Sequence, residues 1–297
     1  MEKNFSSKIC LLTLFIAFGL FSGALNGQDK LTPEEVIAKH LESIGTAEAR
    51  SAVKSVLIVG TSKAVFRGRG GGSTAGVAVL ASEGEKNLIG MKFDNVEYPF
   101  EKMGYDGKDF SVGYITPGNP STLGQFLRIN ENSFKHGILG GTLSTSWELL
   151  DFDQNKAKIK YSGTEKVNGK KLHKLKYEPK KGSDMTITMF FDSETFHHVR
   201  TEYKRTFAAN IGGGFGGANS SASRVDNSAG QSETRYTLIE EFDDFRTENK
   251  LMMPHSYKIY IEILSGNGTA TREWTMSLQK FNFNQAIDPK EFRVDSY

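Results

Sequence analysis

Four closely spaced acidic residues are the first candidates for chemistry in this chain: Glu240, Glu241, Asp243 and Asp244. Paired carboxylates can serve as general acid and general base when their surroundings shift their pKa values apart. The alternative is the solvated end of a strand, where carboxylates perform no reaction. The chain has no Gly-x-Ser-x-Gly elbow that would point to a serine hydrolase. The sequence therefore favours the solvated strand end.

The adjacent histidines His197 and His198 suggest a metal site. Neighbouring residues of a strand point to opposite faces, so the two imidazoles cannot easily bind one ion. The chain also has no His-Glu-x-x-His motif. We expect no metal ion and no other cofactor.

The glycine-rich run from Arg67 to Thr74 resembles a phosphate-binding or RNA-binding loop. It lacks the Gly-Lys-Ser/Thr ending of a phosphate loop, and no helical pattern follows it. A hairpin loop is favoured, and contact of Arg67 and Arg69 with anionic headgroups is the alternative. The chain carries 37 basic and 35 acidic residues, a formal net charge of +2. So balanced a charge provides no long-range field for nucleic acid, and we expect no nucleic-acid partner.

The N-terminus resembles an export signal, predicted over residues 1–27. Lys3 and Lys8 precede an apolar run from Ile9 to Phe21, and small residues follow it. An uncleaved membrane anchor is the alternative, although the run is shorter than the ~20 residues that a span needs. Cys10 is the only cysteine, so a cleaved chain would have no disulfide and no thiolate. The signal predicts a periplasmic protein with at most transient membrane contact.

Residues 28–297 contain no obvious linker and are predicted to form one domain. Thr32 and Glu35 form a capping box around Pro33, which predicts a helix that ends at Gly45. A second short helix is expected over about 47–54. Strands with one apolar face follow; examples are Met185, Ile187, Met189 and Phe191 in one strand, and Trp274, Met276 and Leu278 in another. The Gly/Ser-rich stretch 208–230 is predicted to be a flexible loop.

Ser121 to Leu150 departs from this strand pattern and has apolar residues at helical spacing. Breaks at 130–132 and at Gly140-Gly141 predict two or three short helices. An apolar helical stripe between strands must pack on a sheet face. We therefore predict an α+β fold: a large curved antiparallel sheet of about ten or eleven strands. It forms a half-open β-barrel, with the N-terminal and mid-chain helices covering its concave face and 121–150 acting as a lid.

Three local patterns carry a resemblance to a known family. Residues 190–200 read Phe-Phe-Asp-Ser-Glu-Thr-Phe-His-His-Val-Arg, residues 242–255 hold Asp-Asp-Phe-Arg and then Leu-Met-Met-Pro-His, and residues 284–292 read Asn-Gln-Ala-Ile-Asp-Pro-Lys-Glu-Phe. In this order they resemble the LolA/LolB-like superfamily of periplasmic lipoprotein carriers. The connection at 248–250 lacks the glycine that is usual there, and 137–147 resembles an exported branch of the superfamily. The resemblance implies a non-enzymatic carrier of lipoprotein acyl chains or other lipids, with an envelope protein as a further partner.

The predicted binding site is therefore the hollow between the lid and the sheet. The candidate lining residues are the large apolar side chains of both parts: Phe93, Phe100, Phe126, Phe134, Leu139, Leu143, Trp147, Met189 and Trp274. For each residue the alternative is an ordinary place in a packed core. The favoured function is an exported protein that binds a lipid, acyl chain or other hydrophobic ligand. The alternatives are a packed structural or envelope-assembly module without a ligand and, third, an enzyme of unknown type, for which no group of residues in the sequence gives support.

Overall fold

The computed structural model describes residues 31–68, 71–150, 152, 158–178, 184–207, 233–266 and 268–294. All of them belong to one compact unit, Leu31–Tyr297. The predicted export signal and the predicted loop 208–230 lie outside the described residues. No helix in the part of the chain described here is long and apolar enough to span a membrane.

Twelve antiparallel strands form one sheet, in the order β5-β4-β3-β2-β1-β14-β13-β12-β11-β10-β9-β8. Their bounds are β1 Ser55–Arg67, β2 Gly72–Glu83, β3 Lys86–Phe93, β4 Phe100–Tyr105, β5 Phe110–Val112, β8 Lys158–Val167, β9 Lys170–Glu178, β10 Thr186–Asp192, β11 His198–Phe207, β12 Thr234–Glu248, β13 Leu251–Ser265 and β14 Gly268–Phe283. Strands that are adjacent in the sheet are also consecutive in the sequence, with one exception. Strand β1 pairs with β14, which joins the first strands of the chain to the last. The edge strands β5 and β8 do not pair, so the sheet is open.

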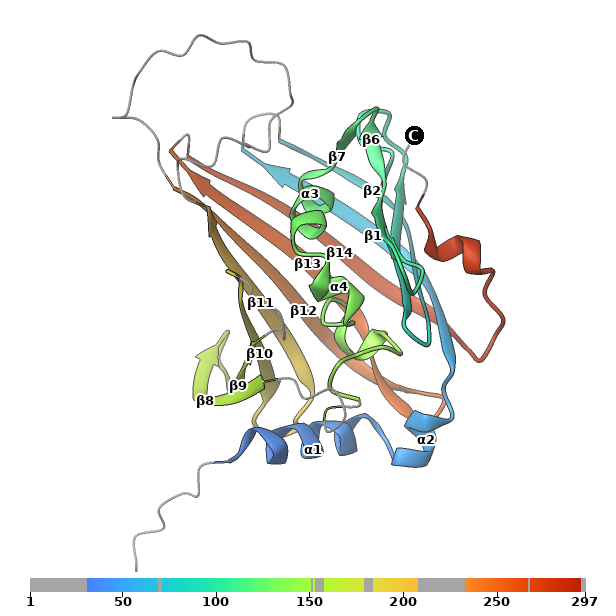
Figure 1. Ribbon diagram of the computed structural model, residues 1–297, viewed down its shortest axis with the longest axis vertical. Helices are drawn as coiled ribbons and strands as arrows, with labels where there is room; N and C mark the ends of the chain where they lie inside the picture. Colours follow the sequence, from blue (N-terminus) through green and yellow to red (C-terminus); the bar gives the residue numbers. More distant parts are fainter. Residues whose placement is uncertain are drawn as a thin grey trace, which may run out of the picture. The chain divides into compact units, whose positions relative to one another are not determined.

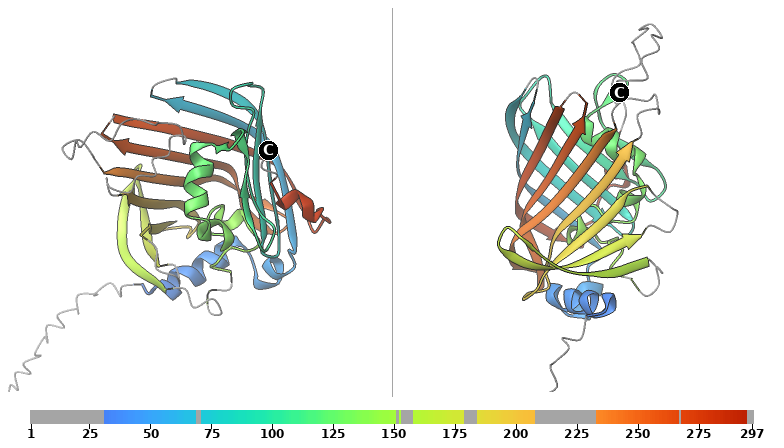
Figure 2. Two further views of the ribbon diagram at one scale, coloured as in Figure 1. Left: turned by 45° about the horizontal axis from the view of Figure 1, so that its top comes forward. Right: turned by 90° about the vertical axis from the view of Figure 1, so that its left-hand side faces the viewer.

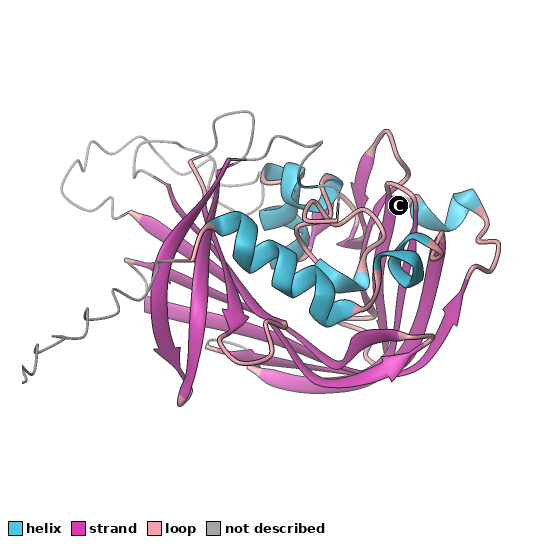
Figure 3. Ribbon diagram, turned by 90° about the horizontal axis from the view of Figure 1, so that it is seen from below, coloured by secondary structure: helices cyan, strands magenta, loops and turns pink. Residues whose placement is uncertain are grey.

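The sheet curves around the N-terminal and mid-chain helices, which lie on its concave side (Figures 1 and 3). Figure 2 shows strands running side by side on the outer face of the sheet. The 3-10 helix η2 (Pro289–Phe292) lies against part of this face, where Phe292 packs with Ala81 and Leu88. The inner faces follow the predicted alternation. Met189, Phe191, Trp274 and Met276 are each at most 1 % exposed, whereas Thr186 on the opposite face of β10 is exposed. The predicted α+β fold with an open, curved antiparallel sheet is confirmed.

Helices α1 (Pro33–Ile44) and α2 (Ala47–Ser51) precede the sheet. The predicted capping box is present: the Glu35 amide donates to the Thr32 hydroxyl, and the Thr32 amide donates to the Glu35 carboxylate at 2.7 Å. One face of α1 is buried, with Val36 fully covered. By contrast, α2 has no buried residue. The second helix is shorter than predicted, and an irregular segment leads from it into β1.

The segment 121–150, called the insert below, lies across the concave face of the sheet (Figure 1). A short ribbon of β6 (Tyr114–Thr116) and β7 (Asn119–Pro120) leads into it. The insert contains α3 (Thr122–Ile129), α4 (Asn132–Lys135) and the 3-10 turn η1 (Gly141–Leu143). The predicted breaks are confirmed, since Asn130 ends α3 and Gly140 precedes η1 with φ 89°. Residues 144–150 form turns rather than the expected further helix.

Within the described residues the main sheet has twelve strands, close to the ten or eleven expected. One sequence expectation needs correction. The acidic cluster does not mark a strand end, since β12 continues to Glu248 and pairs with Leu251 of β13. Asp243 and Asp244 are exposed, as expected of solvated carboxylates, but Glu240 is completely buried.

Candidate functional site

The insert is held on the sheet by buried polar groups, and the first of them is Glu101 on β4. Its carboxylate, 1 % exposed, accepts a hydrogen bond from the Ser121 hydroxyl at 2.6 Å and another from the Tyr98 hydroxyl. Ser121 also caps α3, because its hydroxyl accepts from the Gly124 amide at 2.9 Å. Burial raises the pKa of Glu101 to about 7, although the hydrogen bonds from Ser121 and Tyr98 act in the opposite direction.

Glu240 on β12 is the second anchor. One carboxylate oxygen accepts from the Gly140 amide of the insert at 2.7 Å and from the Tyr257 hydroxyl at 2.5 Å. The other oxygen accepts from the Tyr203 hydroxyl at 2.6 Å. Burial raises the pKa of Glu240 to about 7 despite these three donors. The carboxylate lies under the insert, so it holds Gly140 in place and is closed off from solvent.

The third contact is a network of hydroxyl and amide groups beyond η1. The Asn87 side chain on β3 accepts from the Ser144 hydroxyl at 2.5 Å and donates to the Ser146 hydroxyl at 2.6 Å. The Thr145 amide donates to the Ser82 hydroxyl at 2.9 Å. These bonds fix residues 144–146 of the insert against β2 and β3.

The two adjacent histidines point to opposite faces of the sheet, as predicted. His197 stacks on Phe245 with ring centroids 4.4 Å apart, whereas the fully buried His198 stacks on Trp147 of the insert at 5.1 Å. Burial lowers the pKa of His198 to about 3, which keeps it neutral. No group of three or more His, Cys, Asp or Glu side chains within the described residues is arranged to hold a metal ion.

The nine residues predicted to line the binding site lie mostly in a packed core. Eight of them are at most 5 % exposed and belong to one apolar cluster: Phe93, Phe126, Phe134, Leu139, Leu143, Trp147, Met189 and Trp274. Phe100 is only half-buried, and its ring lies over Gly113. Trp274 also borders a hollow of about 360 Å³ at the α3 end of the insert, and Leu143 borders the larger cavity described next.

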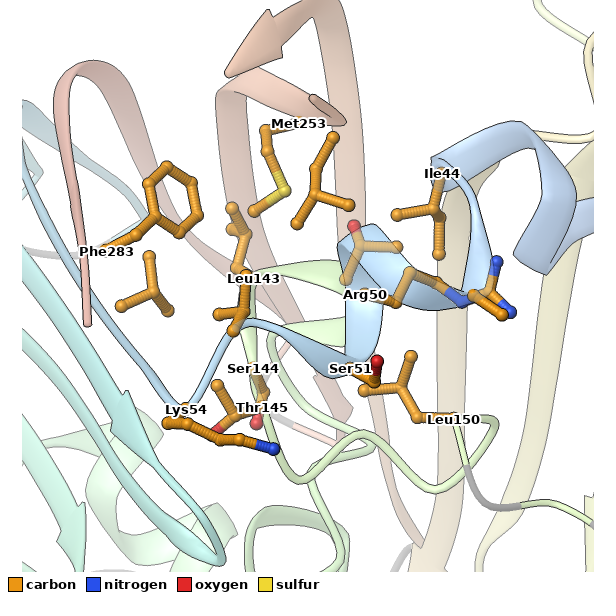
Figure 4. A pocket seen from close by; sticks show the side chains of 15 residues that line it. Ile44, Arg50, Ser51, Lys54, Leu143, Ser144, Thr145, Leu150, Met253 and Phe283 are labelled. Atoms are coloured by element: carbon orange, nitrogen blue, oxygen red, sulfur yellow. The ribbon is translucent and has the colours of Figure 1, made fainter. Parts of the chain in front are cut away.

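A cavity of about 450 Å³ lies where α2, η1 and the ends of β13 and β14 meet (Figure 4). We call it the α2 cavity. Its apolar walls come from parts of the chain far apart in sequence, and its lining residues are Ile44, Ala47, Arg50, Ser51, Val53, Lys54, Val56, Thr142, Leu143, Ser144, Thr145, Leu150, Leu251, Met253 and Phe283. This volume falls within the range of about 300–1,000 Å³ that is typical of sites for small ligands.

The cavity carries positive charge. Among the described residues that line it, none is acidic, and two are basic, Arg50 and Lys54. Arg50 donates from Nη1 to the carbonyl oxygens of Leu41 at 2.6 Å and Gly45 at 2.5 Å, which closes the end of α1. Partial burial lowers the pKa of Arg50 from its usual value.

The position of Lys54 is fixed through its main chain. Its amide donates to the Asn284 side chain at 2.7 Å, and the same side chain donates to the Ala52 carbonyl at 3.0 Å. Asn284 therefore holds the short connection from α2 to β1 beside the cavity, while the Lys54 side chain remains exposed.

The α2 cavity exists because α2 has the sequence Ala-Glu-Ala-Arg-Ser, with no large apolar side chain to place against the sheet. Leu251, Met253 and Phe283 of the sheet therefore face a hollow rather than a helix. The sequence analysis missed this site apart from Leu143. A short helix without an apolar stripe, between two segments that do have one, is the signal that could have located it.

Comparison with known proteins gives similarities of structure only. No family model matches the chain, and no curated protein matches it in sequence. A domain from Vibrio parahaemolyticus assigned to outer membrane lipoprotein sorting is 11 % identical, with a TM-score of 0.42, over 87 % of this chain and 96 % of that one. A LolA superfamily protein from Nitrosomonas europaea is 9 % identical, with a TM-score of 0.44, over 88 % and 97 % of the two chains.

The structure of a Pseudomonas aeruginosa MucA/MucB complex also matches, with 10 % identity and a TM-score of 0.24, over 85 % of this chain and 100 % of that one. Across these three structures the identity is at most 11 % and the TM-score at most 0.44.

Proposed function

We propose that this protein is an exported, non-enzymatic binding protein of the periplasm and that the α2 cavity holds an apolar ligand such as the acyl chain of a lipid or lipoprotein. A role in the trafficking of lipids or lipoproteins to the outer membrane, with an envelope protein as partner, is consistent with such a site. The observation that supports the proposal is a cavity of about 450 Å³ whose walls combine apolar side chains from α1, η1, β13 and β14 with polar ones.

The magnitudes allow an acyl chain to bind there. At ~0.8 kcal/mol for each buried methylene, a twelve-carbon chain gains roughly 9 kcal/mol of gross transfer free energy. Association and the ordering of the chain consume part of this gain. With a cost of about 4 kcal/mol, a surplus of about 5 kcal/mol would remain, which corresponds to a dissociation constant on the order of 0.2 mM.

The groups with the most altered pKa values lie away from this cavity, which supports binding rather than catalysis. Glu101, His198 and Glu240 are buried under the insert, and none of them lines the α2 cavity. A ligand in the cavity would instead meet aliphatic and aromatic side chains, hydroxyl groups and the two basic residues.

A matched pair of substitutions on α2 and its C-cap tests the proposal. Ala47 and Ala52 are both exposed, but only Ala47 lines the cavity. Ala47→Trp should occupy the mouth and weaken the binding of a fluorescent acyl probe by at least about tenfold, whereas Ala52→Trp should leave binding unchanged. The absence of saturable probe binding to the unmodified protein, or equal binding by both variants, would refute the proposal.

A second function, a structural module without a ligand, is favoured by one observation. The space between the insert and the sheet is filled by the protein's own side chains, among them Trp147 and Trp274 at 1 % exposure. Native mass spectrometry of the protein after incubation with dodecanoate separates the two functions. A complex of one protein with one ligand supports the binding protein, and an unchanged mass supports the structural module.

A further inference from the structure

We infer that the α2 cavity selects amphiphilic ligands with a single apolar chain and an anionic headgroup, which Lys54 binds with the support of the Arg50 charge. This inference rests on the proposed function and adds a chemical class of ligand to it. It follows from the distribution of polar and apolar groups around the cavity and from the unpaired state of its two cations.

The cavity has one apolar and one polar end. Figure 4 shows Met253, Phe283 and Leu143 on one side, and Ser144, Thr145 and the Lys54 ammonium on the other. An apolar molecule without a headgroup would leave the polar end unsatisfied. A molecule with one chain and one polar end matches both halves of the lining.

The charge of Lys54 is not neutralised within the described residues. Its ammonium forms no ion pair or hydrogen bond there, because the only bond of this residue with another side chain is the one from its main-chain amide to Asn284. The Lys54 ammonium is therefore a free donor for a carboxylate or phosphate group. The side chain is exposed, so its attraction for an anion is screened by solvent and modest in strength.

Arg50 adds a second positive charge to the cavity lining, beside Ile44 and away from the Lys54 ammonium (Figure 4). Its Nη1 group is used by the Leu41 and Gly45 carbonyls, but these acceptors carry no full charge, so the guanidinium has no ion-pair partner among the described residues. The acidic side chains that act on it, Glu42 and Glu48, are exposed on α1 and α2 and do not line the cavity. The residues that line the cavity accordingly carry a net positive charge.

Three of the four hydroxyl groups that line the cavity already donate to other acceptors, whereas the Thr142 hydroxyl has no hydrogen-bond partner among the described residues. The Thr145 hydroxyl donates to the Gly84 carbonyl at 2.9 Å, the Ser51 hydroxyl to the Glu48 carbonyl at 3.1 Å, and the Ser144 hydroxyl to Asn87 at 2.5 Å. Removing the Lys54 charge should remove most of the preference for an anion, because none of these hydroxyl groups is charged.

The test compares ligands that differ only at the headgroup. Dodecanoate, dodecyl phosphate and dodecan-1-ol each compete with the fluorescent acyl probe at pH 8 and low salt, and acetate and inorganic phosphate serve as headgroups without a chain. We expect both anionic amphiphiles to bind about fivefold to tenfold more tightly than the alcohol. The advantage should shrink in 0.5 M salt. The two free anions should not displace the probe. This result would show that the site recognises the anionic group only when it is attached to an apolar chain.

The matched variants are Lys54→Met and Lys63→Met. Methionine keeps an unbranched apolar side chain and removes the charge, and Lys63 is an exposed lysine of β1 that does not line the cavity. Lys54→Met should abolish the preference for the anionic ligands and leave the affinity for dodecan-1-ol unchanged, whereas Lys63→Met should retain the preference. Equal affinities of the three amphiphiles for the unmodified protein, or a full preference in Lys54→Met, would overturn this inference alone. If none of the three binds, the proposed function fails as well.

Discussion

The packed interior under the insert and the α2 cavity are built from similar residues, but the first is filled by side chains and the second is hollow. In the packed interior, α3 and α4 place Phe126 and Phe134 against the sheet, and both rings are 1 % exposed. At the α2 cavity, the covering helix has no buried residue, and the sheet residues opposite it face a hollow. The difference shows that the covering segment, rather than the sheet, determines where this fold remains open.

The two regions also differ in their electrostatics. The packed interior buries carboxylates, Glu101 and Glu240, and satisfies them with hydroxyl and amide donors from both sides. The cavity presents cations without an ionic partner among the described residues, Arg50 and Lys54. The buried carboxylates indicate that the insert is held in place on the sheet. The unpaired cations beside an apolar hollow indicate a binding site for a ligand.

Removal of the largest side chain of the packed interior should have the largest effect. Trp147→Ala deletes an indole that stacks on His198 and contacts the ring of His40 at 4.8 Å. We expect a loss of about 3–5 kcal/mol in the free energy of unfolding, because the surrounding rings cannot fully collapse into the space. Chemical denaturation measures it, and a loss below about 1 kcal/mol would show that this region is not packed as described.

The buried carboxylates should make the protein less stable as the pH rises. The pKa values of Glu101 and Glu240 are raised to about 7 in the folded state, so between pH 4.5 and 7 the folded protein binds protons that the unfolded chain has released. Its free energy of unfolding should fall through this window, by about 3 kcal/mol for each carboxyl. Denaturation at pH 5, 6 and 8 measures the change.

A glutamine substitution assigns part of that pH dependence to one residue. Glu240→Gln cannot ionise, so the decrease in stability between pH 5 and pH 8 should be about 3 kcal/mol smaller than in the unmodified protein. The neighbouring Glu241→Gln is the control, since Glu241 pairs with Arg200 and Lys258 on a half-buried position. An identical pH profile for Glu240→Gln and the unmodified protein would contradict the role of Glu240.

One substitution made in both regions compares them directly. Leu123 in α3 is completely buried in the packed interior, and Leu143 of η1 lines the cavity. Leu123→Ala should cost about 3–4 kcal/mol, because it loses transfer free energy and creates a void. Leu143→Ala should cost only about 2 kcal/mol, since a hollow is already present. Equal losses in denaturation experiments would remove the distinction between the regions.

The smallest effect concerns the hairpin that carries Leu251 and Met253 to the cavity. Asn249 and Lys250 at its turn both have positive φ, 48° and 66°. Asparagine tolerates this conformation, but lysine is strained in it. Lys250→Gly should raise the free energy of unfolding by about 1 kcal/mol and leave ligand affinity unchanged, because no lining side chain is altered. A destabilised variant would show that the lysine side chain has a stabilising contact at the turn.

Local sequence signals were sufficient for most of the fold. The capping box of Thr32 and Glu35, and the alternation through Met189 and Trp274, depend on nearby residues, and both were predicted correctly. The extension of β12 to Glu248 was not predictable in this way. The stretch after Phe242 is strongly polar, and it becomes a strand only because β13 pairs with it.

The site was harder to predict for the same reason. Apolar residues such as Trp147 and Met253 look alike in sequence, because both follow the pattern of a core. Which of them borders a cavity depends on what lies opposite after folding. In this protein that is decided by α2, η1 and the last residues of β14, which are far apart along the chain.

The most direct test of the central claim distinguishes two methionine methyl groups. Met253 lines the α2 cavity, and Met189 is completely buried in the packed interior. With ¹³C-methyl-labelled methionine and bound dodecanoate, NMR should show nuclear Overhauser contacts from the acyl chain to the Met253 methyl group and none to the Met189 methyl group. Contacts to Met189, or none to either, would contradict the α2 cavity as the binding site.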